Sequence, residues 1–136
     1  MPVTRARLFG VLAALALSST LLGAQQAASA PAHPAGPSAQ ALQRAAEQCG
    51  RNEICFWQDN DYQGTPWRWT PTSGYRDMPP YLHDNVGSFY ANAAGCFIDW
   101  DPHEMRKVAS GDYSAAYKAG GKFGSRIDAV TTYQSC

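Results

Sequence analysis

The chain has 136 residues, enough for one small domain, with eleven Lys and Arg, eleven Asp and Glu and a formal net charge of zero. This balance argues against a protein that holds nucleic acid or an anionic membrane through a basic surface. The four cysteines indicate either disulfides or a metal site, depending on the compartment.

The first thirty residues are typical of a secretory signal peptide. Arg5 and Arg7 precede an apolar run, LFGVLAALALSSTLLGA, and the small residues of 27–30 follow it. An uncleaved anchor is the alternative, but the run is shorter than the ~20 residues that a membrane span needs. We therefore predict cleavage near Ala30 and a secreted, extracellular protein without a membrane attachment. The remainder has nine Lys and Arg against eleven Asp and Glu, a net charge of −2.

All four cysteines, Cys49, Cys55, Cys96 and Cys136, follow the leader. In an oxidising compartment this even number predicts two disulfides, for which three pairings exist. We favour Cys49 with Cys55, which closes a small local loop and leaves Cys96 to pair with Cys136. A zinc site would need close CxxC-type pairs, which the sequence lacks.

Residues 31–48 connect the leader to the cysteine-containing part. The segment PAHPAGP at 31–37 is too rich in proline and alanine to bury a core, which predicts a linker. Ser38 can cap a short helix over 39–48, where the residues are good helix formers and Leu42 is the only large apolar side chain. We interpret 31–48 as a linker or pro-segment that contains this helix.

Residues 49–136 are predicted to form one all-β domain, because short apolar runs alternate with clusters of Gly, Pro, Asn and Asp. The segment CFWQDNDYQG at 55–64 and the alternating 67–70 that follows predict a β-hairpin, with an aromatic side chain over its turn. The full set of expected strands is 53–58, 67–70, 86–92, 96–100, 106–109 and 127–133.

An internal repeat appears at an offset of 41 positions. Cys55 aligns with Cys96, and 83–89 aligns with 124–130, where apolar residues meet apolar residues. Two similar β units can bury one face against each other as a sandwich, which neither could do alone.

Trp57, Tyr62 and Gly64 match the pattern aromatic, four residues, aromatic, any residue, Gly. This pattern resembles the βγ-crystallin Greek-key motif. The leading CxxxxxC and the later HDNVGSFYANAAGC resemble bacterial βγ-crystallin-like inhibitors, peptidase inhibitor family I36. The resemblance covers 49–136 and implies a two-motif Greek-key sandwich stapled by disulfides. No second copy of the aromatic pattern follows Phe97, so the topology of the second half rests on the repeat.

The resemblance implies a monomeric inhibitor of extracellular peptidases, with metallopeptidases as the target type, which occupies an active-site cleft with a rigid loop. One candidate loop is 70–84, with Tyr75, Met78 and Tyr81 expected to be exposed, and the other is the turn 92–96. The alternative is a non-inhibitory βγ-crystallin-like structural module, or one that binds calcium or carbohydrate.

Many βγ-crystallin domains bind calcium through a segment of two acids, two variable residues, Ser or Thr, and Ser. The segment HDNVGS at 83–88 places Gly87, which has no side-chain ligand, in the fifth position. A shift by one restores Ser88 there but puts Phe89 last. Asp84 and Ser88 are the candidate ligands, and the alternative is a turn stabilised by its own side chains. We expect no other cofactor.

The sequence contains no convincing catalytic group. His103 and Glu104 begin an HExxH-like stretch, but Lys107 stands where the second His belongs. The three histidines and the oxidised cysteines form no arrangement of nucleophile, base and orienting group. We therefore expect no enzymatic activity.

Overall fold

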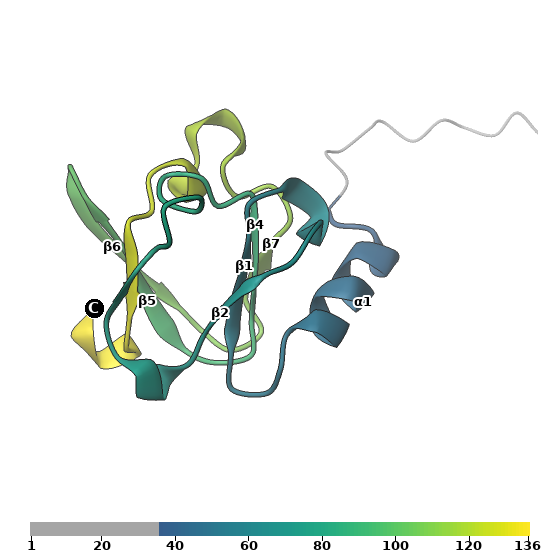
Figure 1. Ribbon diagram of the computed structural model, residues 1–136, viewed down its shortest axis with the longest axis horizontal. Coiled ribbons are helices and arrows are strands. Elements are labelled where there is room, and N and C mark those ends of the chain that lie inside the picture. The colour runs from purple at the N-terminus through teal and green to yellow at the C-terminus, as the bar shows by residue number, and fades with distance from the viewer. Residues whose placement is uncertain (1–35) are drawn as a thin grey trace, which may run out of the picture. The chain divides into compact units, whose positions relative to one another are not determined.

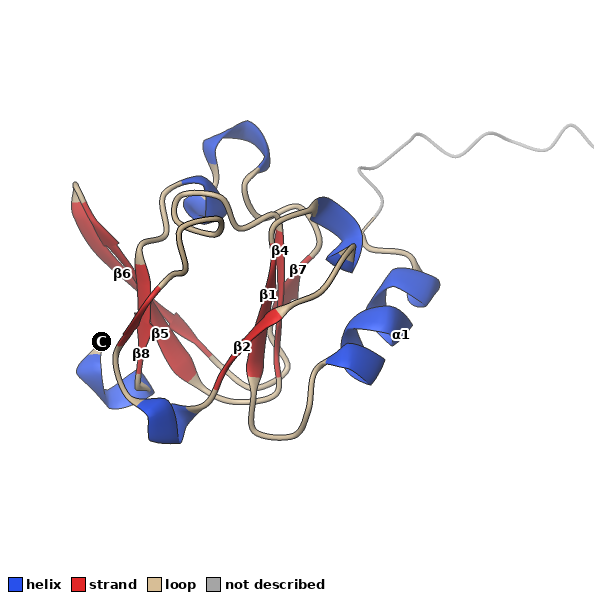
Figure 2. Cartoon of the chain, viewed as in Figure 1, coloured by secondary structure: helices blue, strands red, loops and turns tan. Residues whose placement is uncertain are grey.

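The computed structural model describes residues 36–136, so the predicted signal peptide and residues 31–35 of the linker lie outside the described residues. Within 36–136 the chain forms one α-helix, eight strands and five short 3-10 helices (Figure 2). The helix and strands are α1 (Ala39–Gln48), β1 (Ile54–Trp57), β2 (Trp67–Trp69), β3 (Arg76–Asp77), β4 (Ser88–Ala91), β5 (Gly95–Trp100), β6 (His103–Val108), β7 (Tyr113–Ser114) and β8 (Ala129–Thr131).

The α1 helix begins after Ser38, whose Oγ accepts a hydrogen bond from the backbone N of Ala41 at 3.1 Å. Ala41 and Ala45 are buried, and their small side chains let the helix approach the domain closely. Trp57 Nε1 donates a hydrogen bond to Gln48 Oε1 at 3.3 Å. The helix therefore packs beside the sheet that contains β1 (Figure 1) although it has few large apolar residues.

The strands form two four-stranded sheets, in the orders β2-β1-β4-β7 and β3-β8-β5-β6. Every pairing is antiparallel. In each half of the chain the fourth strand returns to lie beside the first, which is the Greek-key connection. The third strand of each half joins the sheet of the other half. The two sheets form the two layers in Figure 1, and each is built from both halves.

The strand register confirms the repeat predicted from the sequence. In the first half Phe56 of β1 is opposite Phe89 of β4, and in the second half Phe97 of β5 is opposite Val130 of β8. Both residues of the second pair lie 41 positions after their counterparts. The predicted fold class, an all-β sandwich of two Greek-key motifs, is therefore confirmed.

The core lies between the sheets. The Phe97 ring centroid is 5.1 Å from those of Phe56 and Phe89, so aromatic side chains from both layers meet at its centre. Disulfides join Cys49 to Cys55 and Cys96 to Cys136, which is the favoured pairing.

Two strands, β3 and β7, lie where loops were predicted. Each has only two residues, too few for an alternating pattern to show. The β6 strand also begins at His103, three residues before the predicted start, and its polar composition reflects its position at the edge of the sheet.

Candidate inhibitory surface

The aromatic motif of the first half stabilises the fold. The Trp57 and Tyr62 rings form an edge-to-face pair with centroids 5.3 Å apart. Tyr62 has φ of 57° and Gly64 has φ of 84°, which turns the chain back over the ring. Ser88 Oγ accepts a hydrogen bond from Tyr62 N at 3.0 Å and donates one to Asp59 O at 2.7 Å. Trp57, Tyr62 and Ser88 are buried and stabilise the turn, so a partner cannot contact them. Asp59 and Gly64 are exposed.

The 70–84 loop is partly built into the second sheet. Its β3 segment pairs with β8, and Met78 N donates a hydrogen bond to Asp128 O at 2.8 Å. The expected exposure of Met78 is wrong: its side chain is 3% exposed and packs in the core. Tyr75 and Tyr81 are exposed, so these two of the three predicted contact residues remain candidates.

The 92–96 turn offers little surface. Ala93 is buried, and Gly95 is buried so closely that a Cβ atom there would lie 2.8 Å from Ile54 Cδ1. The side chain of Asn92 is directed toward a neighbouring loop.

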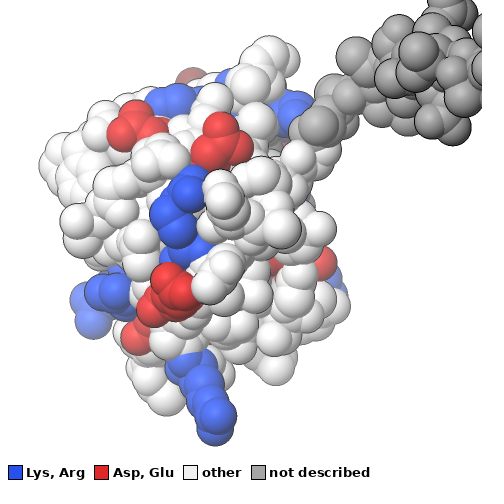
Figure 3. Space-filling view, turned by 90° about the vertical axis from the view of Figure 1, so that its right-hand side faces the viewer, with Lys and Arg blue, Asp and Glu red and all other residues white. Residues whose placement is uncertain are grey.

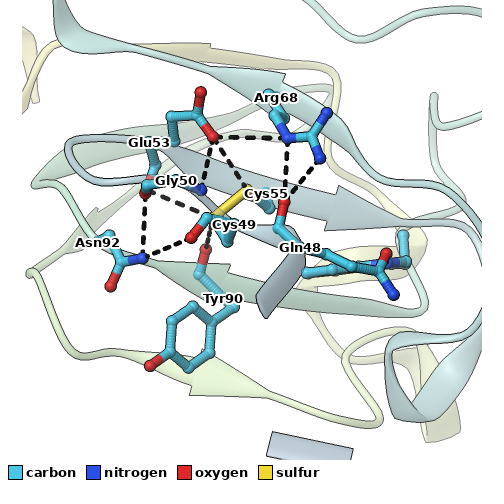
Figure 4. The surroundings of a disulfide bond; sticks show 9 residues. Gln48, Cys49, Gly50, Glu53, Cys55, Arg68, Tyr90 and Asn92 are labelled. Atoms are coloured by element: carbon cyan, nitrogen blue, oxygen red, sulfur yellow. Dashed lines mark hydrogen bonds and ion pairs between the residues drawn. A yellow bond between two sulfur atoms is a disulfide. The ribbon is translucent and has the colours of Figure 1, made fainter. Parts of the chain in front are cut away.

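That neighbour is the disulfide loop, residues 49–55 (Figure 4), whose Cys49 and Cys55 have an S–S distance of 2.05 Å. Inside it, the Glu53 carboxylate accepts a hydrogen bond from Gly50 N at 2.8 Å. Asn92 Nδ2 donates to the carbonyl oxygens of Cys49 and Gly50, both at 3.1 Å. Figure 4 thus shows the backbone of the loop held by one of its own side chains, Glu53, and by Asn92 from a separate segment.

Arg68 on β2 holds the entry to the disulfide loop. It donates to Gln48 O from Nη2 at 2.7 Å and from Nε at 3.1 Å, and its Nε lies 3.5 Å from Glu53 Oε2. The tip of the loop consists of Arg51 and Asn52, both exposed. Asn52 has φ of 59°, a left-handed conformation that Asn tolerates better than most residues. The sequence pattern did not predict this loop as a contact surface, although the close spacing of its cysteines was visible.

Comparison with known proteins identifies the relatives of this fold. The model described as peptidase inhibitor family I36 matches residues 42–100, which confirms the family predicted from the sequence. A gerABC family protein of Dictyostelium discoideum is 40% identical over 83 residues, which is 61% of this chain and 73% of that protein. The chain belongs to the gerABC family.

Two further relatives of the gerABC chain are also from Dictyostelium discoideum. One is another gerABC family protein, 34% identical over 58% of this chain and 62% of its own length. The other is spore germination protein 1, 33% identical over 57% of this chain and 61% of its own length. The chain thus spans less than two thirds of both of these relatives.

A solved structure described as "Evolution of the eye lens beta-gamma-crystallin domain fold" aligns with a TM-score of 0.46 and 14% identity, over 60% of this chain and 85% of that chain. The Greek-key arrangement of the gerABC chain is established by its own strand order. The I36 match runs from α1 to the end of β5 and contains the disulfide loop, the 70–84 loop and the 92–96 turn.

The predicted calcium ligands lie in different surroundings. Asp84 is exposed and forms a cluster with His83 and Asp128, in which His83 Nδ1 is 3.4 Å from Asp84 Oδ2 and His83 Nε2 is 3.1 Å from Asp128 Oδ1. Ser88, in contrast, is fully buried. The repeat could have identified Asp128, since it aligns with Gly87 of the candidate segment.

The oxygen ligands of this cluster fit calcium poorly. Calcium requires six to eight oxygens around one point, whereas an imidazole lies between the carboxylates of Asp84 and Asp128 and the Ser88 hydroxyl already makes two hydrogen bonds to the backbone. Asp128 Oδ2 also accepts a hydrogen bond from Trp100 N at 2.6 Å.

Carboxylates elsewhere form structural ion pairs. Asp99 is buried and accepts a hydrogen bond from Arg126 Nη1 at 2.7 Å. Hydrogen bonds from Arg126 and Arg106 lower the pKa of the Glu104 carboxyl. The hydrogen bonds to Glu104 favour its ionised form.

The face that carries α1 has mixed charge. Figure 3 shows Lys and Arg side chains interspersed with Asp and Glu on this face, without a large field of one sign. None of the helices described in 36–136 is long and apolar enough to span a membrane.

Proposed function

We propose that the protein is a secreted inhibitor of extracellular peptidases, with metallopeptidases as the target class, and that it blocks the active-site cleft with a rigid loop. The observation that carries the proposal is the I36 match over residues 42–100. This segment includes the disulfide loop and the side chains of Arg68 and Asn92 that hydrogen-bond to it and to its entry. The proposal requires no catalytic group on the inhibitor.

The rigidity of the fold supports this mechanism. An inhibitor loses affinity if a loop must be ordered when it binds, because each immobilised side chain costs conformational entropy. Here a disulfide closes the loop, Asn92 holds its backbone, and Arg68 holds the Gln48 carbonyl at its entry before any partner binds. A loop that is already ordered can occupy a cleft with little further loss of conformational entropy.

The test is a titration of the purified, oxidised protein against thermolysin, as the metallopeptidase probe, and against trypsin, as a serine-peptidase probe. We expect the residual activity of thermolysin to fall as inhibitor is added and to approach zero at micromolar excess. Protein unfolded by reduction is the control and should not inhibit. Full thermolysin activity at micromolar excess would remove metallopeptidases of this type from the proposal, and full activity of both enzymes would overturn it.

A second candidate function is carbohydrate binding, because aromatic rings are exposed together at one end of the second sheet. Trp100 is 48% exposed, its ring stacks on His103 with centroids 5.2 Å apart, and its Nε1 donates a hydrogen bond to Tyr75 OH at 3.3 Å. Fixed aromatic rings of this kind offer apolar area at little entropic cost. Sedimentation with insoluble cellulose and chitin tests this candidate, with Trp100→Ala as the variant expected to lose binding.

A further inference from the structure

We propose that the disulfide loop, residues 49–55, is the part of the molecule that enters the peptidase cleft, with the Arg51 side chain leading. This inference rests on the proposed function and assigns its contact surface. The sequence favoured the 70–84 loop and the 92–96 turn as the inhibitory contact surface, and this inference assigns that role to the disulfide loop.

The tip of the disulfide loop is the part available to a partner. Arg51 and Asn52 are both exposed. Neither residue makes a hydrogen bond or ion pair, through backbone or side chain, with the rest of 36–136. Their backbone donors and acceptors therefore remain available for bonds to an enzyme.

The base of the disulfide loop, in contrast, is fixed on both sides. Cys49 caps α1, since its backbone N donates to Ala45 O at 2.9 Å, and Ile54 begins β1 with a fully buried side chain. The backbone N of Asn92 also donates to Glu53 O at 2.8 Å. An exposed tip on an anchored base is the combination that a rigid-loop inhibitor requires.

The other two loops lack this combination. In the 70–84 loop Met78 is buried and β3 is part of a sheet, and its exposed residues, such as Tyr75, Arg76 and Tyr81, are not carried on a tip that a disulfide closes. In the 92–96 turn Ala93 and Gly95 are buried. Asn92 contributes to the contact surface indirectly, because its amide holds the disulfide loop.

The chemistry of the tip indicates which kind of cleft it fits. The nearby carboxylate of Glu53 accepts a hydrogen bond from Gly50 N and lies beside Arg68, so it does not neutralise Arg51. The leading group is therefore a guanidinium without a paired anion in the described domain. A cleft with a carboxylate at its base would complement this charge, as in a peptidase that accepts basic side chains.

The experiment compares Arg51→Glu, Arg51→Lys and wild-type protein as inhibitors of thermolysin and trypsin. Arg76→Ala is the matched control, because Arg76 is also exposed and also makes no side-chain hydrogen bond in 36–136. For each peptidase that wild type inhibits, we expect Arg51→Glu to raise the inhibition constant by about thirtyfold or more, as at an interface hot spot. Arg51→Lys and Arg76→Ala should stay close to wild type, and unfolding curves should show that all variants fold.

The possible outcomes separate this inference from the proposed function. If wild type inhibits neither enzyme, the proposed function and the inference fail together. If wild type inhibits and Arg51→Glu inhibits equally well, the proposed function stands and the assignment of the disulfide loop is overturned. A loss of inhibition in Tyr75→Ala or Tyr81→Ala, with none in Arg51→Glu, would assign the contact to the 70–84 loop instead.

Discussion

Gly87 occupies a position that only glycine fits. A Cβ atom on this residue would lie 2.3 Å from Gln58 O and 2.4 Å from the carbonyl carbon of Asp59, and backbone atoms cannot move aside as a flexible side chain can. We expect Gly87→Ala to lower the free energy of unfolding by about 2 kcal/mol or more, measured by urea denaturation. Gly36→Ala is the control, because no atom lies within 4 Å of a Cβ there. Equal stability of both variants would contradict the close contact at Gly87.

The close contacts of Gly87 also argue against calcium binding by the 83–88 segment, because no residue with a side-chain ligand fits at position 87. We therefore expect millimolar calcium to leave the melting temperature of the protein unchanged relative to a sample in EDTA. Asp84→Asn should show the same melting temperature with and without calcium. A calcium-dependent rise of several degrees in wild type, absent from Asp84→Asn, would contradict this expectation and support a site at Asp84 and Asp128.

Two tyrosines make the fold sensitive to alkaline pH. Burial raises the pKa of the Tyr117 hydroxyl above its usual value of 10.0, although Arg106 and Arg126 partly oppose this, and burial also raises the pKa of Tyr62. The unfolded chain therefore ionises first, so stability is complete below about pH 10 and is lost as the pH rises further. Urea midpoints measured between about pH 8 and about pH 11 should fall. In Tyr117→Phe this fall should be shallower, and an identical slope would contradict the assignment.

At the scale of single elements, short apolar runs bounded by Gly, Pro, Asn and Asp predicted six of the eight strands of the described residues. These six bury at least part of one face, and burial is what such runs indicate. The β3 and β7 strands were missed because their two residues are held mainly by pairing with β8 and β4, which are distant in the sequence. Met78 was assigned to the surface for the same reason: the prolines around it predicted a loop, while its burial depends on tertiary packing.

The candidate surface was predictable only in part. The spacing of Cys49 and Cys55 predicted a closed loop, and the disulfide confirms it. The contacts that make the loop rigid come from Arg68 and Asn92, which are 20 and 42 residues away from their partners Gln48 and Gly50. Such hydrogen bonds follow from the strand order, which no local pattern specifies.

Asn92 should determine how rigid the disulfide loop is. Asn92→Ala leaves the carbonyl oxygens of Cys49 and Gly50 without their side-chain donor, which favours local opening of the loop. With two hydrogen bonds lost, we expect trypsin to cleave after Arg51 about tenfold faster or more than in wild type. Mass spectrometry of timed digests identifies the cut.

Asn60→Ala is the control for this digest, because Asn60 is exposed and its side chain makes no hydrogen bond in 36–136. Its rate of cleavage after Arg51 should equal that of wild type. If Asn92→Ala is cleaved no faster than Asn60→Ala, the amide of Asn92 does not hold the loop.

At the scale of the whole molecule, the exchange of strands makes the halves depend on each other. The β3 strand belongs to the first half but pairs with β8, and β7 of the second half pairs with β4. The segment that matches the I36 model ends with β5, so it contains β3 without its partner strand. The disulfide loop is thus presented by the first half, while the sheets that support it require both.

The two disulfides should therefore have separable effects. Cys49–Cys55 joins residues 6 positions apart and Cys96–Cys136 joins residues 40 apart, so the second restricts the unfolded chain more. The loop-entropy relation gives about 2 kcal/mol for the first bond and about 4 kcal/mol for the second. Replacement of Cys96 and Cys136 by Ser should cost more stability in urea denaturation than replacement of Cys49 and Cys55.

The two disulfides should have the reverse order of importance for inhibition, with Cys49–Cys55 contributing more than Cys96–Cys136. At a temperature where both double variants remain folded, the variant without Cys49–Cys55 should lose inhibition, because its loop is no longer closed and must be ordered on binding. The variant without Cys96–Cys136 should retain it. Titrations against the inhibited peptidase, with circular dichroism to confirm folding, measure both effects. Unchanged inhibition by the variant without Cys49–Cys55 would mean that the short disulfide contributes only to stability and is not what keeps the loop ready to bind.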